Sequence, residues 1–142
     1  TAFFIFTNMK KVEHIGIAVK DLTNANRLFE KLFNQPHYKL EKLESEGVST
    51  SFFKVGQTKI ELLEPSNNNS PIAKFIKKRG EGIHHIAFEV EDIEAEMQRL
   101  QAEGFQLIHH SPKDGADNKS ICFLHPKTTN GVLIELCQEK AK

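Results

Sequence analysis

The chain has 142 residues, of which 39% are hydrophobic and 27% are charged, as is usual for one globular domain. Its 19 basic residues balance its 19 acidic residues. Proteins whose main partner is a nucleic acid or a membrane surface usually carry a basic excess, so this balance argues against both partners. The sequence also contains no apolar run of about 20 residues, the length that spans a bilayer.

The cysteines and the first residues set further limits. Cys122 and Cys137 are too few for a disulfide framework, and we expect both to be reduced and apolar. Residues 1–8 precede Met9, which reads as a natural start, and they lack the basic region of a signal peptide. We therefore expect residues 1–8 to be an added leader. We also expect a bacterial cytoplasmic protein in preference to one of the mitochondrial matrix.

The first half of the chain predicts a strand, a helix and three further strands. Alternation over residues 11–20 predicts a strand with His14 among small residues on a cavity face and Glu13 among isoleucines on a helix-packed face. Further strands are expected over residues 37–43, 48–55 and 59–64. Between them, a helix over residues 21–33 is predicted by a cap at Asp21 or Thr23 and by apolar spacing of Leu22, Leu28, Phe29, Leu32 and Phe33.

A loop and a short helix over residues 66–81 join the two halves, with Ser70 as cap, Pro71 in the first turn and Gly80 at the end. The second half then repeats the plan. We expect strands over residues 81–90, 105–109, 120–125 and 131–137, a helix over 92–103 and a polar loop over 111–119. Two β-α-β-β-β modules, about 11–65 and 82–138, thus form one α+β domain over residues 9–142 with a curved mixed sheet.

An internal repeat supports this division. His14 aligns with His85, 71 residues later, and the residues that follow align as well: Ile15 with Ile86, Gly16 with Ala87, Val19 with Val90 and Asp21 with Asp92. Downstream, Glu61 in an Ile-Glu-Leu strand aligns with Glu135 in a second one, 74 residues later. Two copies indicate a duplicated module and not a solenoid array.

Four residues therefore recur at matched places: His14, Glu61, His85 and Glu135. Two imidazoles and two carboxylates on faces that curve together can hold one divalent metal, and donors without a thiolate suit Ni, Co, Fe(II), Mn or Zn. An octahedral ion with four protein ligands keeps two positions for water or substrate.

A single histidine on a strand is more often a satisfied polar residue than a ligand, and a glutamate in such a strand usually faces solvent. Duplication of all four residues is what favours the metal site. His85 shares its strand face with the residues that match those around His14, whereas His84 lies on the helix-packed face. The histidines without a matched counterpart are expected to be surface or structural residues: His37, His84, His109, His110 and His125.

At these residues the chain resembles the vicinal-oxygen-chelate superfamily, in which paired β-α-β-β-β modules form a metal cleft (the glyoxalase-like fold). Within that superfamily it is similar to the methylmalonyl-CoA epimerases. The resemblance runs over residues 11–138. It is carried by the segments 12–19, 47–48, 60–65, 82–90, 112–116 and 125–136, of which the last two are the most specific.

The resemblance implies metal-dependent interconversion of (2R)- and (2S)-methylmalonyl-CoA, a reaction of propionate metabolism, by proton removal and return at C2 through a metal-stabilised enolate. It implies one divalent metal, Co(II) first and Ni, Mn, Zn or Fe(II) as alternatives, held by His14, Glu61, His85 and Glu135. It also implies an acyl-CoA as the small-molecule substrate and a homodimer.

We expect Glu135 to be the base at C2 and Glu61 to be the second choice. Some epimerases carry a further glutamate where this chain has Ser49 and Thr50, so no residue there can take an acid/base role. Charge alone makes Lys113, Lys119 and Lys127 the candidates for the CoA phosphates.

Three alternatives stay open at the level of sequence. Glyoxalase I (lactoylglutathione lyase) uses the same kinds of ligand. An Fe(II) dioxygenase uses two histidines and one carboxylate, so a fourth ligand counts against it. A metal-free ligand-binding protein of the same fold generally lacks the four ligands.

Overall fold

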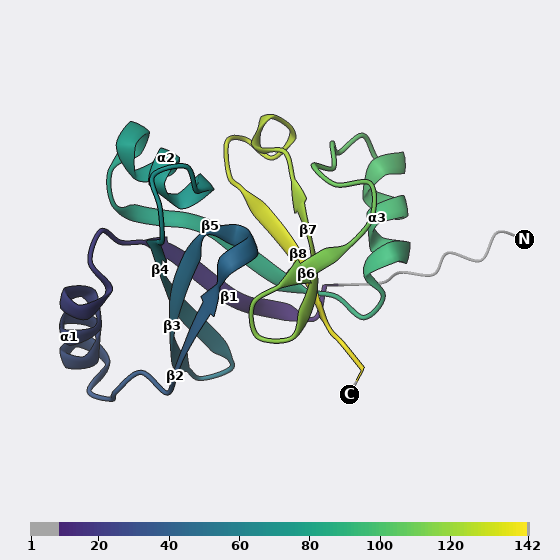
Figure 1. The fold of residues 1–142 in the computed structure, drawn as a ribbon. Coiled ribbons are helices and arrows are strands. Elements are labelled where there is room, and N and C mark those ends of the chain that lie inside the picture. The colour runs from purple at the N-terminus through teal and green to yellow at the C-terminus, as the bar shows by residue number, and fades with distance from the viewer. Residues whose placement is uncertain (1–8, 142) are drawn as a thin grey trace, which may run out of the picture. The chain divides into compact units, whose positions relative to one another are not determined.

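The computed structural model describes residues 9–141, which form two compact units (Figure 1). The first unit comprises residues 13–87, and the second comprises residues 9–12 and 88–141. The expected leader, residues 1–8, lies outside the described residues. Among residues 9–141, no helix has the length and apolar character that crossing a membrane requires.

The strands of the first unit form a mixed sheet because one of its pairings is parallel. The antiparallel strands β2 (Lys39–Leu43), β3 (Val48–Val55) and β4 (Thr58–Pro65) follow one another, and β1 (Lys11–Ala18) pairs with β4 in parallel. A short 3₁₀ helix, Glu44–Glu46, joins β2 to β3. Strand β5 (Gly82–Glu89) comes next to β1 in the strand order.

Two helices cover the apolar side chains of this sheet. Helix α1 (Leu22–Phe33) is capped by the Asp21 side chain, which accepts a hydrogen bond from the Asn24 N–H, and its buried side packs Phe29 and Phe33 on Phe53. Helix α2 (Pro71–Arg79) begins at the Ser70 cap and packs on β4 through the cluster Ala18, Val48, Leu63 and Ile72.

One detail of α1 corrects the sequence reading. Helical spacing predicts Leu28 and Leu32 on the apolar side of this helix, but they are 64% and 68% exposed. They lie one helical turn apart on the side that solvent reaches, and the packed side is formed by Leu22, Phe29 and Phe33.

The second unit packs one helix on an antiparallel sheet. Strands β6 (Lys113–Gly115), β7 (Lys119–Leu124) and β8 (Ile134–Glu139) follow one another, and a 3₁₀ helix, Pro126–Thr128, precedes β8. Helix α3 (Ile93–Ala102), green in Figure 1, packs on β7 and β8. Its core includes Met97, Leu100 and Leu136, together with the free and buried Cys122.

The predicted strand over residues 105–109 is wrong. Leu107 makes a single isolated bridge with Leu124, and the third strand of the sheet is β6, inside the segment that we expected to be a loop. Asp117 and Asn118 adopt positive φ angles of 59° and 56°, which close the hairpin between β6 and β7. Such turns favour Asn and Asp because their short polar side chains tolerate this conformation.

Candidate metal centre

His14 and His85 meet in the first unit. Their Nε2 atoms lie 3.0 Å apart, and the rings pack edge to face with centroids 5.1 Å apart. Both residues are buried, His14 on β1 and His85 on β5. The structure thus brings His85, and not His84, to the Nε2 atom of His14.

Gly16 makes room for this meeting. A Cβ atom placed on Gly16 would lie 2.3 Å from Cε1 of His85, far inside any van der Waals contact. The φ angle of Gly16 is not positive, so a glycine is required here by the lack of space for a side chain and not by the backbone conformation. The equivalent position of the second module holds Ala87.

Glu61 reaches the same imidazole from the neighbouring strand. The parallel register pairs Gly16 of β1 with Glu61 of β4, two residues beyond the pairing of His14 with Lys59. The Oε2 atom of Glu61 lies 3.2 Å from Nδ1 of His14, and Glu61 is buried. The carboxylate therefore approaches the ring at the nitrogen that faces away from His85.

Glu13 is a residue of this site that the sequence analysis missed. We expected it on an apolar helix-packed face, but its Oε1 atom lies 2.8 Å from Nδ1 of His14 and its Oε2 atom lies 2.9 Å from Nζ of Lys59. Burial alone raises the pKa of Glu13, but the hydrogen bonds and charges of His14 and Lys59 outweigh it and lower the pKa from 4.5 to about 2. A glutamate in an otherwise apolar face is the one sequence signal that could have flagged it.

His84 supports the second imidazole in a similar way. Its Nδ1 atom lies 2.9 Å from Nδ1 of His85, and its own ring packs edge to face on Phe75 of α2, with centroids 4.9 Å apart. This contact agrees with the expected helix-packed side of His84, and it adds a link to His85 that the sequence did not reveal.

These residues fit a divalent metal by their donor chemistry and spacing. Two imidazole nitrogens that each lie about 2.1 Å from one ion, at a right angle, are about 3.0 Å apart. The Nε2 atoms of His14 and His85 show this separation, 3.0 Å. The Glu61 carboxylate lies at Nδ1, on the other side of the His14 ring. Without an ion, the same distance is that of a hydrogen bond between the rings.

The remaining predicted residues lie in the second unit. Glu135 is buried on β8, opposite Phe123 of β7. Lys119 is buried at the start of β7, Lys113 is half-buried on β6, and Lys127 is exposed on the 3₁₀ helix before β8.

The position of the further glutamate of some epimerases is filled by a hydroxyl. Thr50 lies on β3 opposite Leu63, two residues from the pairing of Phe52 with Glu61, so its side chain shares the sheet face of Glu61. Thr50 is buried, and its Oγ1 atom has no hydrogen-bond partner within the described chain. A hydroxyl at this place cannot act as a carboxylate base.

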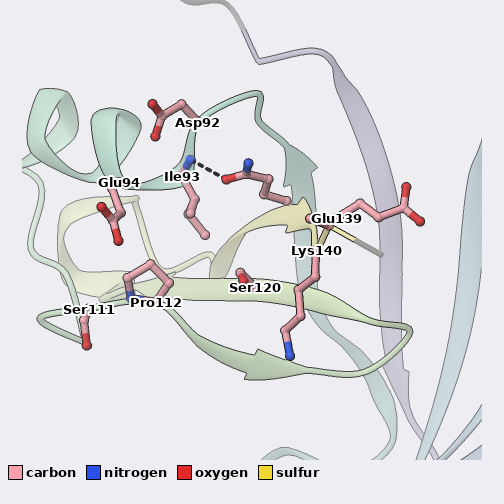
Figure 2. Close-up of a pocket in the computed structure, with 10 residues that line it drawn as sticks. Asp92, Ile93, Glu94, Ser111, Pro112, Ser120, Glu139 and Lys140 are labelled. Carbon is pink, nitrogen blue, oxygen red and sulfur yellow. Dashed lines mark hydrogen bonds between the residues drawn. The ribbon is translucent and has the colours of Figure 1, made fainter.

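A cavity of about 490 Å³ lies elsewhere, in the second unit, beside the start of α3 (Figure 2). Figure 2 shows its rim, where the Ile93 N–H donates to the Gln138 side chain at 2.9 Å. Its lining includes Ser111, Ser120 and Lys140 but no histidine, and none of the expected ligands or lysines lines it. It therefore lacks the mixed nitrogen and oxygen donors of the first site.

Comparison with known proteins places this site in a known context. Residues 13–123 match the family described as the Glyoxalase/Bleomycin resistance protein/Dioxygenase superfamily. The chain is 42% identical to the mitochondrial methylmalonyl-CoA epimerase of Dictyostelium discoideum, over 89% of this chain and 76% of that protein. It is 41% identical to an ethylmalonyl-CoA/methylmalonyl-CoA epimerase of Cereibacter sphaeroides, over 90% and 97%.

A solved structure resembles the chain equally well. A variant of Streptomyces coelicolor methylmalonyl-CoA epimerase, in complex with 2-nitronate-propionyl-CoA, superposes with a TM-score of 0.90 at 32% identity. The match covers 94% of this chain and all of that one, 100%. The likeness therefore extends over both units and is not confined to the histidine site.

Proposed function

The chain belongs to the Glyoxalase/Bleomycin resistance protein/Dioxygenase superfamily, and on that premise we propose that it is an isomerase that epimerises (2R)- and (2S)-methylmalonyl-CoA at C2. The observation that carries the proposal is the meeting of His14 and His85, whose Nε2 atoms lie 3.0 Å apart. It is supported by relatives that match 89–90% of this chain and are named as epimerases of this substrate.

The proposed metal site consists of His14, His85, Glu61 and Glu135. His14 and His85 contact each other through their Nε2 atoms, and Glu61 lies on the Nδ1 side of His14. Glu61 and Glu135 are included in the proposal because the repeat pairs them. A divalent ion held by these residues would supply Lewis acidity toward the thioester oxygen of the substrate. Co(II) is the proposed ion by family resemblance.

Glu135 is the proposed base that removes the proton from C2, and Glu61 is the proposed donor that returns a proton on the other face. Both carboxylates are buried, so water competes little for the same proton. The repeat relates the two residues, which is why they are proposed for the two opposite faces of the carbon.

The rest of the proposal concerns the substrate tail and the assembly. Lys113, Lys119 and Lys127 are proposed to face the phosphates of CoA, since they are the lysines of the β6–β7 hairpin and of the following 3₁₀ helix. The homodimer and the bacterial cytoplasm stay predictions from the family resemblance and the sequence.

The direct test follows the C2 proton by NMR. Protein loaded with Co(II) is incubated with (2R,2S)-methylmalonyl-CoA in D₂O, beside a control stripped with EDTA. We expect metal-dependent exchange of the C2 proton well above the uncatalysed rate, and inversion in an assay coupled to a stereospecific mutase.

The other outcomes separate the alternatives. Absence of exchange with metal bound would reject the epimerase, and isomerisation of the glutathione hemithioacetal would then identify a glyoxalase I activity. Tight binding of an acyl-CoA by metal-free protein, without exchange, would identify a binding protein of the same fold.

A further inference from the structure

The residue directly before each metal-binding histidine contacts the Nδ1 atom of that histidine. In the first module, Oε1 of Glu13 lies 2.8 Å from Nδ1 of His14. In the second module, Nδ1 of His84 lies 2.9 Å from Nδ1 of His85. Glu13 and His84 are themselves 71 residues apart, so they occupy equivalent places in the repeat.

We propose that Glu13 and His84 are positioning residues: each holds the Nδ1 atom of the following histidine, so that its Nε2 atom is left for the metal. This inference rests on the proposed metal site, but it concerns how the ligands are held and not what the enzyme acts on. Metal-bound histidines generally donate their second N–H to such an outer partner, which fixes the tautomer and the ring orientation.

Glu13 is suited to this role because it is an acceptor that cannot move. It is 2% exposed, and its second oxygen is held by Lys59 at 2.9 Å, so both carboxylate oxygens are engaged. An ionised carboxylate only accepts hydrogen bonds, and both carboxylates at Nδ1 of His14, Glu13 at 2.8 Å and Glu61 at 3.2 Å, therefore require His14 to donate from Nδ1; Glu13 is the nearer acceptor. With a neutral ring, the Nε2 atom of His14 then carries the lone pair that a metal needs.

The same reasoning assigns the other two rings in the metal-free protein. If Nε2 of His14 accepts, the neutral His85 donates to it from Nε2 across 3.0 Å. Nδ1 of His85 then carries a lone pair, and Nδ1 of His84 donates to it across 2.9 Å. The three hydrogen bonds therefore all donate in one direction, from the ring of His84 toward the carboxylate of Glu13.

Metal binding would require new tautomers of His85 and His84 but not of His14. His14 already presents the lone pair of Nε2, but His85 must move its proton from Nε2 to Nδ1. Nδ1 of His84 must then accept, so its proton moves to Nε2. The first ligand is preset for the metal, and the second switches tautomer together with its neighbour.

The first arm of the test measures Co(II) affinity by competition with a chelator. We expect Glu13→Leu to weaken binding by about 10- to 100-fold, and His84→Phe by about 10-fold. Glu13→Gln and His84→Asn keep an acceptor for Nδ1, so each should restore affinity to within a few-fold of the original protein. His110→Phe, which changes an exposed histidine, is the matched control and should leave affinity unchanged.

The second arm records the ¹⁵N spectrum of the imidazoles during a titration with Zn(II), which is diamagnetic. We expect His14 to keep its proton on Nδ1 throughout. His84 should change from the Nδ1–H tautomer to the Nε2–H tautomer as the metal binds. A merely structural role for His84 would leave its tautomer unchanged.

The outcomes distinguish this inference from the proposed function. Folded Glu13→Leu and His84→Phe proteins that bind Co(II) as tightly as the original protein would overturn the inference, whatever the activity. If Glu13→Leu does not fold, the Gln and His84 variants and the spectrum decide. Original protein that binds Co(II) through these tautomers but exchanges no C2 proton would refute the epimerase and leave the inference standing. If the original protein binds neither Co(II) nor Zn(II), both the positioning inference and the proposed metal-dependent function are overturned.

Discussion

The two histidines of the site occupy equivalent places in a duplicated sequence, yet different side chains support them. Behind His14 lies the buried carboxylate of Glu13, which is paired with Lys59. Behind His85 lies a second imidazole, His84, which packs on Phe75 of α2. The two modules also differ beside the ligands, where the first has Gly16 and the second has Ala87.

The comparison shows that the two modules share the proposed ligands but differ in the residues that support them. The ligands recur because both modules face one proposed ion, whereas a supporting residue has only to satisfy Nδ1. A carboxylate can satisfy it only as an acceptor, and an imidazole can do so as donor or acceptor. The first module is therefore the fixed side of the site, and the second is the adaptable side.

The largest expected effect concerns the paired carboxylates. Glu135→Gln should lower kcat by about 10²- to 10⁴-fold, because a side chain that takes up a proton in the transition state usually contributes that much. Stopped assays with metal-loaded protein measure it, and Glu139→Gln, exposed on the same strand, is the control. A Glu135→Gln protein with bound metal and near-full activity would break the assignment of the base to the second module.

The next effect tests the fixed side by pH. The pKa of Glu13 is lowered from 4.5 to about 2, so the unfolded chain binds the proton more readily than the folded one. The stabilisation, about 3 kcal/mol for such a shift, is present above pH 4.5 and is lost as the pH falls through 2.

Urea unfolding of metal-free protein and of its Glu13→Gln variant, at a series of pH values, measures this contribution. Their difference in free energy of unfolding should shrink as the pH falls from 5 toward 2. Glu44→Gln, at a highly exposed carboxylate, should show no such trend. A Glu13 difference that stays constant across this range would contradict the ionised pair with Lys59.

A smaller effect should follow when the first module is given the residue of the second. Gly16→Ala places a methyl group 2.3 Å from the His85 ring, so the ring must move. We expect a loss of about 1–3 kcal/mol in stability, together with weaker Co(II) binding. When His85→Ala has removed the ring, adding Gly16→Ala should cost little further stability, so the double variant should be nearly as stable as His85→Ala alone. Losses that simply add in the double variant would argue against the clash.

The smallest effect concerns the lysines, all three of which lie in the second unit. Lys127 is exposed, and an exposed ion pair contributes about 0.2–1 kcal/mol. Lys127→Gln should therefore raise KM for the acyl-CoA by about 1.4- to 5-fold and leave kcat unchanged. Lys31→Gln, at an exposed lysine of α1, should change neither. An unchanged KM for Lys127→Gln would remove this residue from the proposed phosphate contacts.

Most elements could be predicted from the sequence because their signals are local. The Ser70 cap with Pro71 marks α2, and helical spacing marks α1 and α3. The prediction of a strand over residues 105–109 was wrong because strand formation depends on pairing. This segment makes one isolated bridge, between Leu107 and Leu124, and the polar hairpin around Asp117 and Asn118 supplies β6.

The sequence predicted only those residues of the candidate site that recur in the internal repeat. The repeat places His14 on His85 and Glu61 on Glu135, and the structure brings the two histidines together. Glu13 was missed because its role depends on the register that lays Lys59 beside His14. Strand alternation gives the face of a side chain, but it does not give the neighbour on the next strand.

A crystal structure of the Co(II)-loaded protein, with anomalous scattering at the cobalt edge, tests the central claim most directly. We predict one strong peak in contact with the Nε2 atoms of both His14 and His85, with Nδ1 of His14 still bonded to Glu13. A peak at any other group of residues, or an empty position between two hydrogen-bonded imidazoles at saturating Co(II), would contradict the account.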